Sequence, residues 1–181
     1  MNLSETQRKY LIQDHVIAGS VINALLNAGL AWLGFRHHAD VPMTGDPGII
    51  RDTIATMVLL PLFTCVIVTP LVRKSLAAGK VEALYKPSPE RSMLLWLPSS
   101  SFLRGLTLAL ASLALCGAPI LGIFLLAGVD AMSVGGYVLI KAIYAGVLAA
   151  IVSSLSALYV LASAAVSGGV AQLAPERAES A

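Results

Sequence analysis

Residues 53–72, TIATMVLLPLFTCVIVTPLV, form a run of twenty residues without a formal charge. Coiled into an α-helix, such a run is roughly 30 Å long, which matches the thickness of the hydrocarbon layer of a bilayer. Strands that cross a membrane alternate polar with apolar residues, whereas this run is apolar on every side. The stretch therefore predicts a helix that spans a membrane.

Three further uncharged runs, at residues 16–35, 105–129 and 142–171, share this character. The 181-residue chain is 57% hydrophobic and 12% charged, against roughly 25% charged residues in an ordinary soluble domain. Its mean hydropathy is +0.81. We therefore predict an all-α polytopic membrane protein, a bundle of four transmembrane helices at about 16–35, 53–72, 105–129 and 142–166.

Polar segments frame these spans. We expect a lead-in at residues 1–15, one membrane domain at 16–171 with a long loop at 73–104, and a flexible tail at 172–181. Apolar side chains recur on one helical face of KSLAAGKVEALYK, residues 74–86. This pattern predicts that the second span continues as a helix along the membrane surface. The first run exceeds the apolar part of a secretory signal and lacks a cleavage site, so we expect it to remain as a span.

Lysine and arginine are distributed unevenly between the two sides of the membrane that four spans define. Nine lie on one side, namely Arg8, Lys9, Arg73, Lys74, Lys80, Lys86, Arg91, Arg104 and Arg177. The other side carries only Arg36, Arg51 and Lys141. The positive-inside rule then predicts that both termini and the 73–104 loop are cytoplasmic, in a bacterial inner membrane. Topology and contact with anionic lipid explain these charges, and we find no nucleic-acid-binding signature.

Two amide side chains lie inside the first span. Asn23 and Asn27 are four residues apart and stack on one helical face, with Gly19 one turn before and Ala31 one turn after. Small and amide side chains at every fourth position are typical of a helix-packing face whose amides bond to a neighbouring helix. The alternative is that the two amides line a path for a small solute.

The second span carries the hydroxyl groups of Thr56 and Thr64, which we assign to the same helix-packing or solute-path set. Between them, Pro61 leaves the carbonyl of Met57 without its usual helical partner, which predicts a bend. Pro119 predicts a second bend, in the third span. Such bends are either purely structural or the hinges of a gate.

The fourth span has a face of small side chains that lets another helix approach closely, from this chain or from another subunit. The face consists of Ala142, Gly146, Ala150 and Ser154, with Ala145, Ala149, Ser153 and Ala157 beside it. Asp52 and Lys141 stand at the outer ends of the second and fourth spans. Their equal depth predicts an ion pair.

The segment GFRHHADVP, residues 34–42, places His37, His38 and Asp40 where the first span meets the outer aqueous face. Metal ligands must converge on one ion, but adjacent histidines point about 100° apart on a helix and to opposite faces of a strand. We therefore expect a solvated helix end and no metal site. A membrane-embedded enzyme that uses this group is a third functional hypothesis.

The spans lack the side chains on which several four-span proteins depend. Small multidrug exporters use an embedded glutamate, and the uncharged runs contain no acidic residue. Four-helix cytochromes bind haem through paired histidines inside the bundle, and the runs contain no histidine. Cys65 and Cys116 are isolated and behave as small apolar residues, and no serine of the fourth span is expected to have a histidine at its depth. We expect no cofactor and no enzymatic activity.

The chain resembles a group of small bacterial inner-membrane proteins of unassigned function, through AWLGFR at residues 31–36 and LLPLFTCVIVTPLVRK at 59–74. The resemblance covers roughly the first ninety residues and implies the four-span topology alone.

Two functional hypotheses of different classes follow. The first is an accessory or scaffold subunit, or a small homo-oligomer, whose partners are the lipid bilayer and other membrane subunits or copies of itself. The alternative is a channel or facilitator for a small neutral solute, lined by Asn23, Asn27, Thr56 and Thr64.

Overall fold

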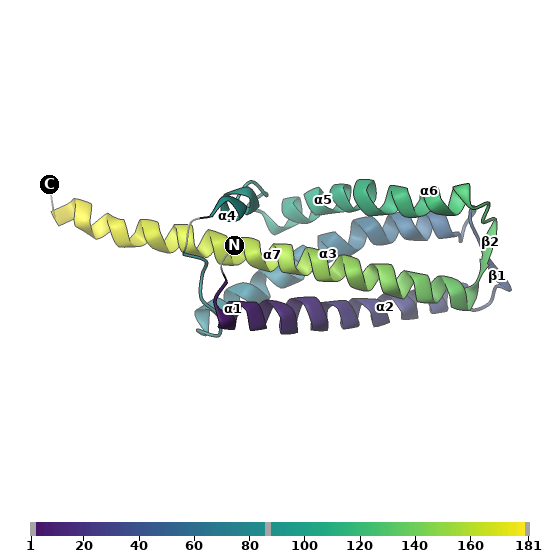
Figure 1. Cartoon of the computed structure of the whole chain (residues 1–181), viewed down its shortest axis with the longest axis horizontal. Helices are drawn as coiled ribbons and strands as arrows, with labels where there is room; N and C mark the ends of the chain where they lie inside the picture. Colours follow the sequence, from purple (N-terminus) through teal and green to yellow (C-terminus); the bar gives the residue numbers. More distant parts are fainter. Residues whose placement is uncertain (1–2, 86–87, 180–181) are drawn as a thin grey trace.

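The computed structural model describes residues 3–85 and 88–179, with side chains described up to Val166. Four helical stretches in this part of the chain are long and apolar enough to cross a membrane, and they form an all-α bundle (Figure 1). They are Glu5–Phe35, Ile49–Ala77, Ser101–Leu126 and Val134–Val166. The side chains of the expected tail, 172–181, lie outside the described residues.

The first span joins three helical segments end to end, α1 (Glu5–Tyr10), the π-helical turn η1 (Leu11–Ile17) and α2 (Ala18–Phe35). The helix starts well before the uncharged run because a capping box holds its first turn. The Ser4 hydroxyl accepts from the Gln7 amide at 3.2 Å, and the Ser4 amide donates to Gln7 Oε1 at 2.9 Å. Most of the expected lead-in is therefore helix.

The second and third spans both contain proline, but only the third span has a π-helical turn next to it. The second span is one continuous helix, α3 (Ile49–Ala77), with Pro61 buried inside it. The third consists of α5 (Ser101–Ser112), a π-helical turn η2 (Leu113–Gly117) and α6 (Ala118–Leu126). Pro119 is the second residue of α6, just after this π-turn, and its missing amide hydrogen removes one α-helical hydrogen bond.

Two short strands join the loops at one end of the bundle, which we call the sheet end. Strand β1 (Asp40–Pro42) pairs antiparallel with β2 (Ala131–Ser133), so that Val41 lies opposite Met132. Helix α7 (Val134–Glu179) begins directly after β2. The sheet thus ties the first hairpin of spans to the second, a pairing that the sequence did not predict.

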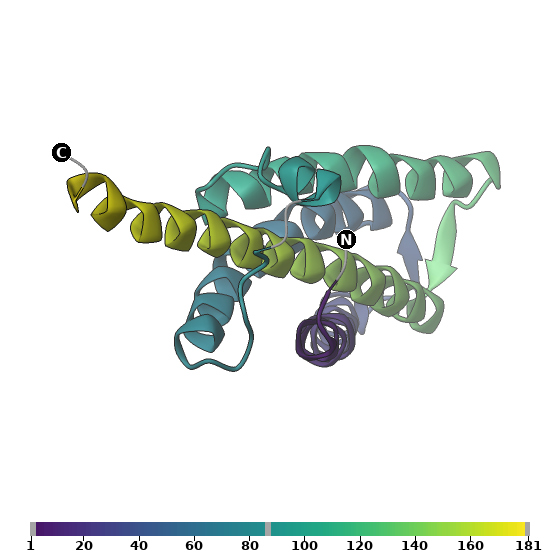
Figure 2. The same ribbon diagram turned by 60° about the vertical axis from the view of Figure 1, so that its left-hand side comes forward.

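Helix α7 is the centre of the bundle. It packs against α2 and α3, and α5 packs on α3, whereas α2 and α3 make few contacts with each other. In Figure 2, where α2 is seen nearly end-on, α2 lies against α7 and apart from α3. A side-chain carbon added at Gly146 would lie 3.3 Å from both Ala24 Cβ and the Ser20 carbonyl. The small-residue face of α7 therefore serves packing of α2 within the chain.

The contact between α5 and α3 depends on one glycine. A Cβ at Gly105 would lie 2.9 Å from Leu62 Cα and 3.1 Å from the Leu62 carbonyl oxygen, which is backbone that cannot rotate away. We expect Gly105→Ala to lower the free energy of unfolding by about 1–3 kcal/mol.

Gly122, in the same span, is the matched control because a Cβ there meets nothing within 4 Å. Gly122→Ala should leave stability unchanged or raise it by up to about 1 kcal/mol. Detergent-solubilised variants compared by thermal unfolding would check this, and equal melting temperatures for both alanine variants would contradict the proposed close approach.

The loop after α3, at the end of the bundle opposite the sheet, is not the predicted surface helix. Helix α3 ends at Ala77 because Gly79 adopts a left-handed conformation, with φ of 68°. The following segment, residues 81–85, is non-helical and lies against the bundle. The side chain of Gln7 donates to the carbonyls of Glu82 at 3.1 Å and Ala83 at 3.2 Å. The second span does continue as helix as far as Ala77, but the prediction of a surface helix was wrong for residues 78–85. The backbone of this segment instead accepts hydrogen bonds from a side chain of the first span.

Buried apolar residues form a core at three heights along the bundle. Val72 and Leu161 belong to the cluster at the end opposite the sheet, which we call the loop end. Met57 and Ala149 belong to the middle cluster, where α3 meets α7. Phe35 and Tyr137 contact edge to face in the sheet-end cluster, with ring centroids 5.4 Å apart. The short helix α4 (Pro89–Leu94) lies in the loop outside these clusters and has no buried residue.

Candidate functional site

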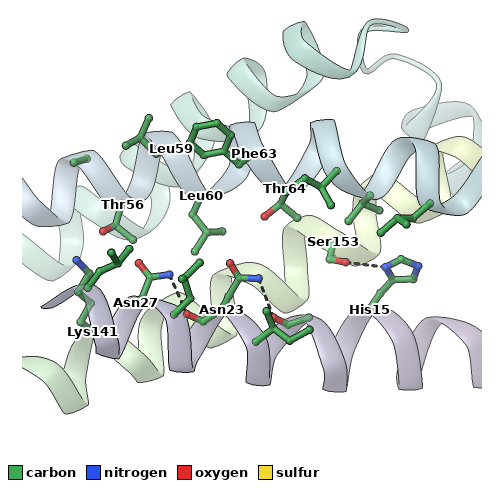
Figure 3. Close-up of a pocket in the computed structure, with 18 of the residues that line it drawn as sticks. His15, Asn23, Asn27, Thr56, Leu59, Leu60, Phe63, Thr64, Lys141 and Ser153 are labelled. Carbon is green, nitrogen blue, oxygen red and sulfur yellow. Dashed lines mark hydrogen bonds between the residues drawn. The ribbon is translucent and has the colours of Figure 1, made fainter. Parts of the chain in front are cut away.

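A groove of about 660 Å³ lies between α2 and α3, with α7 contributing to its lining (Figure 3). It exists because α2 and α3 both pack on α7 and scarcely touch each other. A volume of this size is within the range of pockets that bind small molecules, roughly 300–1,000 Å³. We call this feature the α2–α3 groove.

All four side chains predicted to line a solute path lie in the α2–α3 groove. Asn23 and Asn27 project from α2, and Thr56 and Thr64 project from α3 towards them, with Leu60 between the two threonines (Figure 3). The spacing of the asparagines revealed their shared face. Nothing in the sequence indicated that the threonine face of α3 would lie opposite, because that depends on how both helices rest on α7.

The two amides do not bond across to a neighbouring helix, as the packing interpretation expected. Asn23 Nδ2 donates to the carbonyl of Gly19 at 2.9 Å, and Asn27 Nδ2 donates to the carbonyl of Asn23 at 3.0 Å. Only the amide nitrogen can donate to a carbonyl, so this bonding sets the orientation of each amide. The Oδ1 atoms of both point towards α3 and present acceptors to the groove (Figure 3).

At the sheet end, Asp52 and Lys141 line the groove and form the ion pair that their depth predicted. Asp52 Oδ2 also accepts a hydrogen bond from the Tyr137 hydroxyl. Lys141 is only 2% exposed. It lies two turns inside α7, not at the end of a span, because the helix starts at Val134. The pair thus places a buried charge at one end of the groove.

At the loop end, the groove is lined by Asp14 and His15, both within the π-helical turn η1. His15 is 4% exposed, and its Nδ1 lies 2.8 Å from the Ser153 hydroxyl on α7. Its Nε2 is buried and has no hydrogen-bond partner among the described residues.

The expectation that no serine of the fourth span has a histidine at its depth was therefore wrong, because the first helix begins at Glu5 and carries His15 against α7. Asp14 is exposed and His15 is buried. The sequence placed both in the polar lead-in, and no local pattern indicated the π-helical turn or the burial of His15.

The three residues of the outer-loop group, His37, His38 and Asp40, each have different surroundings. Arg36 Nε donates to His37 Nε2 at 3.0 Å, and His38 packs against the ring of Phe35 with centroids 6.2 Å apart. Asp40 lies in β1. Within the described ranges, no three His, Cys, Asp or Glu side chains are grouped closely enough to hold a metal ion.

Arg104 is a buried charged residue that no sequence pattern predicted. The sequence placed Arg104 among the basic residues at the membrane surface, yet its exposed fraction is 0%. Its guanidinium donates to the Thr69 hydroxyl and to the carbonyls of Pro98 at 3.1 Å and Ser99 at 3.3 Å. It also lies 4.2 Å from the ring centroid of Tyr159. No acidic side chain among those described pairs with it, and it does not line the groove.

Chemically, the groove offers hydrogen-bond acceptors and hydroxyl groups along its length and charged groups at its ends. Comparison with known proteins found no matching family model, no matching curated protein and no matching solved structure. The function of the chain must therefore be inferred from its own geometry.

Proposed function

We propose that this protein is a membrane facilitator whose transport path is the α2–α3 groove. The observation that supports the proposal is a strip of four polar side chains inside an otherwise apolar cavity. This polar strip consists of Asn23 and Asn27 from α2 and Thr56 and Thr64 from α3. Polar groups that face hydrocarbon are costly and tend to mark substrate pathways in membrane proteins. The strip at mid-groove is uncharged, which suits a neutral or dipolar group better than a free ion.

The length of the groove supports a path across the membrane. Its lining extends from Asp14 in η1 to Leu30 in α2, and from Asp52 to Leu71 in α3. At 1.5 Å per helical residue these stretches measure roughly 24 Å and 28 Å. The hydrocarbon layer of a bilayer is about 30 Å thick. A molecule in the groove would therefore meet protein over nearly the whole barrier.

The proposal includes an orientation. The loop end carries most of the lysine and arginine residues, so the positive-inside rule places it, with both termini, in the cytoplasm of a bacterium and the sheet end outside. In this arrangement the groove connects His15 on the cytoplasmic side with the pair Asp52–Lys141 on the outer side. We propose no enzymatic step at the polar strip, because its amides and hydroxyl groups have no adjacent base. The one histidine–serine contact among the described lining residues, His15 Nδ1 to the Ser153 hydroxyl, lies at the loop end of the groove and outside this strip.

An accessory or scaffold role is the second candidate. The small-residue face of α7 no longer supports it, because α2 occupies that face. One observation still favours it: α6 has no buried residue, and an apolar groove of about 270 Å³ lies between α6 and α7. Native mass measurement after gentle solubilisation would test this role, and a protein that purifies alone as a monomer would count against it.

Reconstitution in liposomes tests the facilitator. We expect the wild type to pass urea or glycerol, followed by light scattering after an osmotic step, faster than protein-free vesicles. Asn23→Leu combined with Asn27→Leu should slow this flux roughly thirtyfold, because two lost hydrogen bonds of about 1 kcal/mol each raise the barrier. Folded yield should stay unchanged, since both amides bond only within their own helix.

The matched control for this experiment is Thr107→Val. Thr107 is an exposed threonine of α5 that bonds its own helix through the Leu103 carbonyl and lies outside the groove. The control should conduct like the wild type. A flux that is equal in the wild type and the double leucine variant would exclude the groove as the path.

A further inference from the structure

We propose that the α2–α3 groove carries the head group of an amine-bearing phospholipid across the membrane while the acyl chains stay in the bilayer. This inference rests on the proposed facilitator function and names its substrate. No bond is made or broken. The protein would lower the cost of moving a polar head through hydrocarbon by offering it hydrogen-bond partners on the way.

The first argument is that the groove is open to lipid along its length. The rims are large apolar side chains that remain half-exposed, such as Ile22 at 63% and Leu26 at 56% on α2, and Phe63 at 57% and Ile67 at 56% on α3. In a membrane these side chains face acyl chains. A head group in the groove could therefore keep its chains in the bilayer, whereas a closed channel would exclude them.

The second argument is the chemistry of the strip. Asn23 and Asn27 have committed their Nδ2 donors to their own helix, so each offers the groove an Oδ1 acceptor. An ammonium group has three donors and no acceptor. It therefore fits two amide oxygens at successive depths. The hydroxyl groups of Thr56 and Thr64, which face these amides, can donate to the phosphate that accompanies the amine (Figure 3).

The third argument is the charge at the two ends of the groove. Lys141 is matched by Asp52, whereas Asp14 has no ion-pair partner in the part of the chain described. The lining thus carries a formal charge of −1 if His15 is neutral, from Asp14, Asp52 and Lys141. A head group with a net negative charge would be disfavoured, and one with an ammonium group would be favoured.

The buried imidazole of His15 adds an independent sign of a ligand. It is 4% exposed, it lines the groove, and its Nε2 lacks a hydrogen-bond partner among the described residues. Buried polar atoms are almost always paired in folded proteins, so an unpaired one marks a place where a ligand or water completes the site.

The test uses the full-length protein in liposomes that contain a short-chain fluorescent phospholipid labelled on its acyl chain. Albumin extracts such a lipid from the outer leaflet only, so further extraction reports movement from the inner leaflet. We expect wild-type protein to make inner-leaflet phosphatidylethanolamine extractable, and to move phosphatidylglycerol several-fold more slowly. The double variant Asn23→Leu with Asn27→Leu should move the lipid roughly thirtyfold more slowly. Thr107→Val should retain it.

A second variant tests the charge argument. Asp14→Asn should narrow the difference in rate between the two lipids, because it removes the carboxylate without a partner. Equal rates for the two lipids in the wild type would overturn the proposed preference for an amine. If the wild type conducts glycerol but moves neither lipid, the lipid proposal is wrong and the facilitator stands. If it moves neither lipid nor solute, both are wrong.

Discussion

Replacing Arg104 with alanine is expected to lower the free energy of unfolding by about 3–5 kcal/mol, enough to abolish most of the folded yield of a marginally stable protein. The guanidinium is completely buried and satisfies three acceptors, the Thr69 hydroxyl and the carbonyls of Pro98 and Ser99. Removing it strands these groups in a space that water cannot easily fill, at about 1–3 kcal/mol each. Loss of the contact with the Tyr159 ring adds to this.

The planar geometry of the Arg104 guanidinium should contribute to stability as well as its charge. Arg104→Lys keeps a cation but replaces five fixed donors with one flexible ammonium, which cannot reach the Thr69 hydroxyl and both carbonyls in the same arrangement. We expect a loss of stability between those of the wild type and Arg104→Ala. Unfolding by titrated sodium dodecyl sulfate in mixed micelles, followed by circular dichroism, would rank the three proteins.

Arg51→Ala is the control for this series. Arg51 forms an exposed ion pair with Asp46, and pairs of this kind contribute only about 0–1 kcal/mol. We therefore expect Arg104→Ala to lower the free energy of unfolding much more than Arg51→Ala does. Similar unfolding curves for Arg104→Ala and Arg51→Ala would show that Arg104 does not hold α5 to α3 and the loop.

The second large effect is expected at the ion pair, and it should be asymmetric. The side chain of Lys141 is 3% exposed and that of Asp52 is 28% exposed. Asp52→Ala leaves the more deeply buried charge without a partner and should cost about 3–5 kcal/mol. Lys141→Met leaves Asp52 nearer to water and still bonded to Tyr137, so we expect a smaller loss.

Charge reversal separates pairing from other causes. The combined exchange Asp52→Lys with Lys141→Asp should recover folded yield that either single neutralisation loses, because the two charges again meet. Folded yield by fluorescence-detected size exclusion and stability in mixed micelles would both report it. No recovery in the exchanged protein would contradict the pairing as a source of stability.

The expected ion pair and the expected polar strip differ in how much of each the sequence could predict. The pairing of Asp52 with Lys141 could be predicted, since their positions relative to long apolar runs are a local property. The sequence placed Lys141 at the end of a span, however, and it lies two turns inside α7. Only the asparagine half of the polar strip could be predicted. Four-residue spacing put Asn23 and Asn27 on one face, but which helix they would meet depends on the contact of α2 with Gly146 of α7.

The loop between the second and third spans shows why a correct pattern can give a wrong structure. Its apolar residues have helical spacing, and Val81 and Leu84 are indeed buried. They are buried against other helices in a non-helical conformation. Gly79 ends the helix, and Gln7, 75 and 76 residues away in sequence, supplies the hydrogen bonds. Such long-range donors leave no trace in local periodicity.

The sequence by itself determined four apolar helices of membrane length, because hydrophobicity over twenty residues is enough to specify a span whatever its neighbours are. The tertiary structure alone decided that α2 and α3 both rest on α7 and leave a groove between them. The physical reason is close packing. All four spans are apolar, so in lipid hydrophobicity does not select which of them pack together. Small residues such as Gly105 and Gly146 instead determine which pairs of helices approach closely.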